Sequence, residues 1–285
     1  MRTSEPLMTA RELVEHLHEV CPLPANAQRV LALTGSPRAT MEEVGAALSS
    51  DPALAAEVMR VASSPAYAGA VPPADLQAAA VRLGMSELRD LAAAAAMLAA
   101  FPTHHELALS VHDRSVFAAE LAVALATELG HRRPRTVYLC GLLAELGVLA
   151  CLAVDDEVYA ALRDYVDDDP TLRAFEERAR YGTTSWAIGA ALLRNNGISE
   201  MVCGAIENAP DADDPLAGHI TQFVRFAMPI VFDGAEGDPE WLERLGRLAE
   251  DEELSVPLPR LQALVLSASH ASIEKLRQRM TGAAA

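Results

Sequence analysis

The stretch "LCGLLAELGVLACLA", Leu139–Ala153, is apolar throughout except for one carboxylate, Glu145. Leucine and alanine favour helix, and apolar residues on every side of a helix indicate that protein encloses it. The longest apolar run, Tyr138–Val154, is interrupted by Glu145 and barely reaches the length of a membrane span. We therefore predict a buried helix here. An ionised carboxylate in a core is costly unless it is paired, so Glu145 requires an explanation.

The rest of the chain extends this helical pattern in both directions. Of its 285 residues, 51% are hydrophobic and only 5% are aromatic, which is enough apolar material for a core built largely from small side chains. Apolar residues recur at helical spacing, and no stretch alternates with β-branched residues as a strand does. We predict an all-α protein with roughly thirteen helices and no sheet.

Local signals mark where several of these helices begin and end. The start signals are a capping box and two Asp-Pro pairs: Thr40 with Glu43, Asp51-Pro52 and Asp169-Pro170. The stop signals are Gly84, Pro102, Gly130 and Gly182. The loop "FPTHHE", Phe101–Glu106, combines a helix-stopping proline with two adjacent histidines. It divides the chain into a predicted N-terminal helical bundle, residues 1–103, and a second helical subdomain packed against it, residues 104–285.

The formal net charge of −17 restricts the possible partners. Such a surface repels phosphate backbones and anionic lipids, so we expect neither nucleic-acid nor membrane binding. The one basic cluster is "HRRPR", His131–Arg135. It follows a predicted helix end, where basic side chains suit the helix dipole. A solvated loop and a docking point for an acidic partner or a phosphate are both open for this cluster.

Cysteine usage indicates a reducing compartment. The four cysteines are Cys21, Cys140, Cys151 and Cys203, and none forms a CxxC pair. If Cys140 and Cys151 share one helix they lie about 16 Å apart, too far for a disulfide. The N-terminus also lacks the apolar core of a signal peptide. We therefore expect a cytoplasmic protein with reduced thiols.

Three segments of the N-terminal half follow one another in a recognisable order: "CPLPANAQRVLAL", "SSDPALAAEVMRVASSPAY" and "LQAAAVRLGMSELRDLAAAAAM". Their order and spacing resemble the N-terminal half of the HDOD family, an output domain related to HD-type phosphohydrolases. The matching features are Pro22-Leu23-Pro24, Asp51-Pro52, Ser64-Pro65, Tyr67 and Leu83-Gly84, although the family usually has Asn where Ser63 stands. The similarity continues through "VYLCGLLAELGVL" and "YGTTSWAIGAALLRNNGIS" to the C-terminal helices, and implies that the C-terminal subdomain is HD-like.

The resemblance also implies where HD-type relatives hold divalent metal. Their His-Asp pair belongs at Ala144-Glu145, an upstream histidine at Arg114, and a downstream histidine near Ser185 or Trp186. Alanine cannot act as a ligand through its side chain, and a guanidinium beside a metal cation is unfavourable. We therefore predict no metal, no cofactor and no catalytic residue, so that the protein is not an enzyme.

Other histidines do not restore such a site. The adjacent residues His112 and Asp113 do not form the family's His-Asp pair. The apolar stripe Phe117, Leu121, Leu125 marks the inward face of this helix and extends to Arg114, and His112 points away from that face. The remaining candidates are the loop histidines His104-His105 and the helix residues His16 and His18. They are expected to be ordinary polar residues. No nucleophile elbow or glycine-rich phosphate loop occurs either.

We hypothesise that Arg114 pairs with Glu145, so that its guanidinium replaces the lost cation. In the alternative, Glu145 reaches solvent and Arg114 lies on the surface.

The first functional interpretation is a non-catalytic module for protein–protein interaction in a bacterial signalling pathway, with response regulators, kinases or cyclic-dinucleotide enzymes as partners. The resemblance implies that role. Its predicted docking surface comprises Asp51, Ser64, Pro65, Tyr67, Arg132 and Arg133. The alternatives are a nucleotide or cyclic-dinucleotide sensor that uses the former phosphohydrolase pocket, and an active metal-dependent phosphohydrolase with rearranged ligands.

Overall fold

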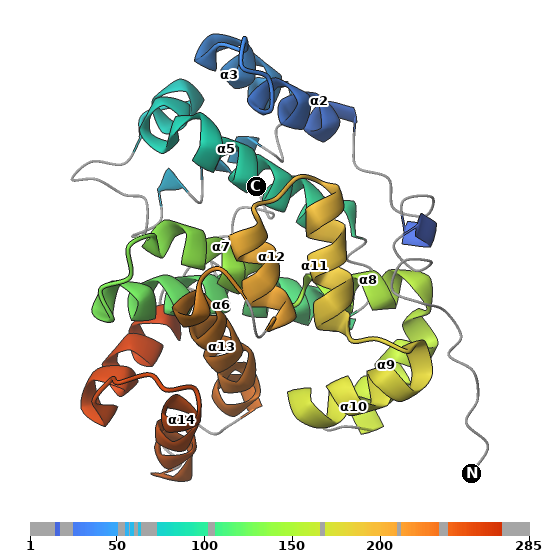
Figure 1. The fold of residues 1–285 in the computed structure, drawn as a ribbon, viewed down its shortest axis with the longest axis vertical. Coiled ribbons are helices and arrows are strands. Elements are labelled where there is room, and N and C mark those ends of the chain that lie inside the picture. The colour runs from blue at the N-terminus through green and yellow to red at the C-terminus, as the bar shows by residue number, and fades with distance from the viewer. Residues whose placement is uncertain are drawn as a thin grey trace, which may run out of the picture.

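The computed structural model describes residues 15–17, 25–50, 55–56, 58–59, 62–63, 73–101, 106–165, 169–209, 212–233 and 239–269. Every regular element in these ranges is a helix (Figure 1), which confirms the all-α class. The N-terminal helices are α2 (Ala25–Thr34), α3 (Met41–Ser49) and α5 (Leu76–Ala100). The following helices are α6 (Glu106–Glu128), α7 (Pro134–Leu143), α8 (Leu146–Val154), α9 (Asp156–Tyr165), α10 (Pro170–Tyr181), α11 (Ser185–Asn195), α12 (Glu200–Glu207), α13 (Pro215–Asp233) and α14 (Pro239–Asp251). Residues 258–269 form a last helical stretch.

The local start and stop signals are realised where the structure describes them. The capping box of Thr40 and Glu43 opens α3, and Asp169 accepts the first free backbone N–H groups of α10. Gly182 ends α10 in a left-handed conformation, φ 69°. Gly84, φ 76°, interrupts α5 where the sequence predicts a helix end, but a second helical segment follows at once and continues the element. The predicted cap at Asp51 lies outside the described residues.

The N-terminal helices stack on one side of the molecule (Figure 1). Both α2 and α3 pack on α5, and α5 in turn packs on α7 of the C-terminal part. Buried apolar side chains form one continuous cluster from α2 to the last helical stretch. The predicted boundary between residues 103 and 104 lies outside the described residues, and the division into two subdomains stays a prediction.

Glycines let the central helices approach one another closely. A Cβ on Gly141 in α7 would lie 2.5 Å from the carbonyl oxygen of Ala118 in α6. A Cβ on Gly147 in α8 would lie 1.7 Å from the carbonyl oxygen of Ser185 at the start of α11. Backbone therefore packs directly on backbone in both pairs of helices.

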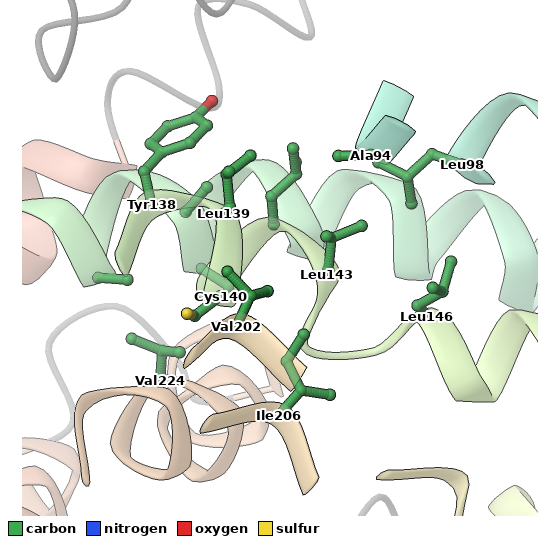
Figure 2. Packing of buried hydrophobic residues seen from close by; sticks show 14 of the residues in the cluster. Ala94, Leu98, Tyr138, Leu139, Cys140, Leu143, Leu146, Val202, Ile206 and Val224 are labelled. Carbon is green, nitrogen blue, oxygen red and sulfur yellow. The ribbon is translucent and has the colours of Figure 1, made fainter. Parts of the chain in front are cut away.

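The single buried helix predicted over Tyr138–Val154 is wrong, because the chain breaks at Ala144 and Glu145 into α7 and α8. The prediction of burial is right: side chains of α7 and α8 lie inside the core, beside α5, α12 and α13 (Figure 2). In length and composition, Pro134–Val154 is the one described segment that could cross a membrane. Protein covers 89% of its most apolar window, as expected for a core element.

Candidate functional site: a buried arginine–glutamate network

Glu145 lies in the turn between α7 and α8 and is only 5% exposed. Its carboxylate receives a two-pronged contact from Arg173 of α10. The Nη1 atom donates to Oε2 at 3.1 Å, and Nη2 donates to Oε1 at 2.9 Å. The planar guanidinium matches the planar carboxylate, which makes this a strong and directional ion pair. The Nε atom of Arg225 lies 3.7 Å from Oε1 of the same carboxylate.

A second carboxylate, Glu177, lies beside the first and is completely buried. It follows Arg173 by one helical turn, and its Oε1 is 3.6 Å from Nε of Arg173. It accepts hydrogen bonds from the hydroxyl of Tyr159 and, at 2.7 Å, from the backbone N–H of Ser185. The cap at Asp169 sets the register of α10, so that Arg173 and Glu177 both face inward.

Arg225 of α13 holds the ends of two helices together. Its Nη2 atom donates to the carbonyl oxygen of Ala144 at 2.9 Å and to that of Ile206 at 3.0 Å. These carbonyls lie at the C-terminal ends of α7 and α12, where no further helical N–H is available and the dipole favours a cation. The guanidinium also lies 4.6 Å from the ring centre of Trp186.

Glu145, Arg173, Glu177 and Arg225 form what we call the buried charge network. Two guanidinium groups face two carboxylates, so the formal charges balance inside the core. Both carboxylates act on Arg173 and raise its pKa despite burial. Burial instead lowers the pKa of Arg225 to about 10, because the cost of burying its charge outweighs the attraction of Glu145. Removing one member of such a set leaves an uncompensated buried charge, which is strongly destabilising.

The cations that the structure shows on Glu145 are Arg173 and, nearby, Arg225. The predicted pairing of Glu145 with Arg114 stays a prediction. Arg114 lies on α6, and its guanidinium carbon is 5.6 Å from the ring centre of Phe232. The alternative in which Glu145 reaches solvent is wrong, since the carboxylate is buried. Arg173 was missed because it is 28 residues from Glu145 in sequence. The only available signal was the inward face of α10.

The positions expected for metal ligands do not fit a divalent cation. Ala144 contributes only a carbonyl oxygen, which accepts from Arg225. The oxygens of Glu145 are held by Arg173, and a metal there would face two guanidinium groups. Ser185 is buried, and its backbone N–H is held by Glu177. Within the ranges described, no three His, Cys, Asp or Glu residues are grouped as a metal site.

Of the other histidines considered as metal ligands, one lies on α6, one lies near the N-terminus and three lie outside the described residues. Phe117, Leu121 and Leu125 are fully buried, which confirms the predicted stripe of α6, whereas His112 is only partly buried. His104, His105 and His18 lie outside the described residues.

Of the predicted docking residues, Asp51, Ser64, Pro65 and Tyr67 lie outside the described residues. Arg132 and Arg133 are exposed in the turn before α7. His131 connects this turn to Asp214, which precedes α13. Its Nδ1 accepts from the backbone N–H of Arg133, and its Nε2 is 2.9 Å from Oδ2 of Asp214.

A cleft of about 700 Å³ opens near the network, where the end of α10 meets α11, α12 and the loop after α12. Its charged lining residues are Arg178, Arg194, Glu200, Glu207 and Asp213. Arg194 bonds both Glu200 and Glu207, with its Nη2 atom 2.6 Å from an oxygen of each. This hydrogen bonding lowers the pKa of Glu200. Three carboxylates thus face two guanidinium groups.

The fold is similar to that of several solved structures. A candidate phosphohydrolase from Shewanella amazonensis SB2B superposes with a TM-score of 0.70 at 24% identity, covering 95% of this chain and 98% of the other. An HDOD domain protein of unknown function from Geobacter sulfurreducens gives 0.60 at 20% identity, covering 93% and 94%. A candidate signal transduction protein from Marinobacter aquaeolei VT8 gives 0.53 at 24% identity, covering 94% of this chain and 62% of that one. At these identities the similarity establishes the fold.

No curated protein matches the sequence. The family model described as the HDOD domain matches residues 20–211, which include α2 to α12 and three of the four residues of the buried charge network. Arg225 lies beyond the matched range. The chain belongs to the HDOD family.

Proposed function

We propose that this protein is a non-catalytic interaction module of a bacterial signalling pathway. The observation that carries the proposal is the contact of Arg173 with both oxygens of Glu145, at the position where the resemblance to HD-type phosphohydrolases implies a metal-binding pair. The guanidinium of Arg173 bonds both oxygens of the carboxylate that would otherwise be available to a metal ion. It also adds positive charge where a metal would bring its own.

The signalling part of the proposal draws on the family. The HDOD name denotes an output domain, and one solved structure of similar fold is named a candidate signal transduction protein. The excess of negative surface charge suits binding to proteins rather than to nucleic acid. The cytoplasmic location expected from the reduced thiols stays a prediction.

The test is a hydrolysis assay on purified protein. Nucleotides, cyclic dinucleotides and bis-p-nitrophenyl phosphate are incubated with the protein in added Mn²⁺, Fe²⁺, Mg²⁺ or Zn²⁺. We expect no turnover above a no-protein control. Turnover that needs metal and is abolished in Glu145→Gln would overturn the proposal and favour the phosphohydrolase alternative. Glu243→Gln on α14, exposed and outside the network, is the matched control.

A nucleotide sensor is the second candidate. Its binding site would be the cleft beside α10 rather than the former phosphohydrolase pocket that the sequence predicts. Around Glu145, where the resemblance implies the phosphohydrolase pocket, lie Arg173 and Arg225, both at most 2% exposed and bonded to protein. The cleft of about 700 Å³ is of the size that holds a nucleotide, and Arg178 is exposed at its wall. Thermal-shift measurements with cyclic dinucleotides and guanosine tetraphosphate test it: a saturable rise in Tm lost in Arg178→Met supports it. An unchanged Tm across the panel contradicts it.

A further inference from the structure

One surface of α10 is unusually apolar for its exposed position. Leu172 is 40% exposed and Phe175 is 64% exposed. Arg178 follows Phe175 by three residues, so the three side chains lie along one face of the helix. Arg178 is also part of the wall of the cleft. The apolar stripe and the polar cleft are therefore continuous along α10.

The polar end of this surface carries a negative excess. Arg194 is shared between Glu200 and Glu207, which leaves one carboxylate charge unbalanced. Only the Oε2 oxygen of Glu207 is bonded to Arg194. Asp213 is exposed at the rim and adds a further negative charge, against the single positive charge of Arg178.

We propose that Leu172, Phe175 and Arg178, together with Glu200, Glu207 and Asp213, form a docking face for a protein segment that carries apolar and basic side chains. The apolar residues of the segment cover Leu172 and Phe175. Its lysine or arginine side chains enter the cleft and meet Glu207 and Asp213. Exposed aromatic residues next to charged ones are typical of the surfaces that bind partner proteins.

Charge complementarity selects this occupant. Two copies of a chain with a net charge of −17 repel each other, which disfavours self-association through this face. The same charge disfavours nucleic acid and anionic membranes. A cationic segment is attracted both by the whole molecule and by the local excess at the cleft, so that its association is steered to this side.

This inference deepens the proposed function and rests on it, because it names where an interaction module binds and the chemistry of its partner. The inward face of α10 carries Arg173 and Glu177 of the buried charge network, while the outward face carries the docking stripe. The network thus holds the docking helix against the core.

The experiment uses the full chain and a fluorescein-labelled amphipathic peptide of ~18 residues, built from leucine and lysine, with a leucine–glutamate peptide of the same length as its counterpart. Fluorescence anisotropy measures the affinity. We expect saturable binding of the lysine peptide only, weakened by added salt. Phe175→Ala and the double variant Glu207→Gln/Asp213→Asn should each weaken it about tenfold, which corresponds to about 1.4 kcal/mol.

The matched control is Glu243→Gln/Glu250→Gln on α14, which removes the same two charges from exposed positions elsewhere. It should change affinity less than about twofold, which is little on the logarithmic scale of binding energy. Equal losses in both double variants, binding of the glutamate peptide, or absence of saturation would overturn the docking face. None of these outcomes bears on hydrolysis, so failure here is distinct from failure of the non-catalytic proposal. Circular dichroism melts confirm that each variant is folded.

Discussion

Arg173 and Glu145 form a two-pronged ion pair across 28 residues of sequence, in a part of the core where both residues are at most 5% exposed. Both charges are largely shielded from bulk water, so each depends on its partners within the core. The pair joins α10 to the turn between α7 and α8 and so connects the outer helix to the centre of the protein.

The pair predicts strong coupling between the two positions. Arg173→Met and Glu145→Gln should each reduce the free energy of unfolding by about 3–5 kcal/mol, because each leaves a buried charge with too few partners. The double variant should lose clearly less than the sum. Urea denaturation of the four proteins measures this. Arg132→Met is the control, since Arg132 is exposed. Strict additivity would contradict the pairing.

Much of the local structure could be predicted from sequence. The caps at Thr40 and Asp169 and the left-handed Gly182 depend on residues within four positions of the helix ends, so the pattern contains the whole cause. The need of Glu145 for a cation was also predictable, because the cost of burying a carboxylate does not depend on topology.

The identity of that cation was not predictable in the same way. Arg173 and Arg225 come from helices far along the chain, and nothing in the local pattern distinguishes them from Arg114. The break at Ala144 was missed for a related reason. Alanine and leucine favour continuous helix, but the carbonyl oxygen of Ala144 accepts a hydrogen bond from Arg225, which is far along the chain.

The contacts of Arg225 indicate that stability depends on the shape of its guanidinium as well as on its charge. Arg225→Lys keeps the positive charge, but an ammonium cannot replace the fork that bonds the carbonyls of Ala144 and Ile206 and the side chain of Gln222 together. We expect the free energy of unfolding to fall by about 2–3 kcal/mol, as for buried acceptors left unpaired. Chemical denaturation measures it. A lysine variant as stable as the wild type would show that these contacts are dispensable.

Gly147 predicts a severe steric effect. Gly147→Ala would place a Cβ 1.7 Å from the carbonyl oxygen of Ser185, so α8 and α11 would have to separate. We expect a loss of at least about 2 kcal/mol. Gly218→Ala in α13 is the control, because a Cβ there meets nothing within 4 Å and alanine favours helix. The control should be neutral or stabilising, and similar losses in both variants would contradict the close packing.

Asp90 predicts a dependence of stability on pH. Burial raises the pKa of its carboxyl from 3.8 to about 6. The folded state therefore binds the proton more tightly than the unfolded state, and the contribution of Asp90 to stability rises as the pH falls from about 6 to about 4. At pH 7.5, Asp90→Asn should stabilise the protein by about 1–2 kcal/mol, and at pH 3.5 it should have little effect. Urea denaturation at both pH values checks this, with exposed Asp213→Asn as the control.

The most direct test of the central claim is the metal content of the purified protein. The protein is expressed and purified in the presence of Mn²⁺, Fe²⁺ and Zn²⁺ without chelators, and its metals are quantified by inductively coupled plasma mass spectrometry. Because Arg173 and Arg225 occupy the surroundings of Glu145, we predict far less than one equivalent of any of these metals, unchanged in Glu145→Gln. One equivalent of bound metal that is lost in Glu145→Gln would contradict the account.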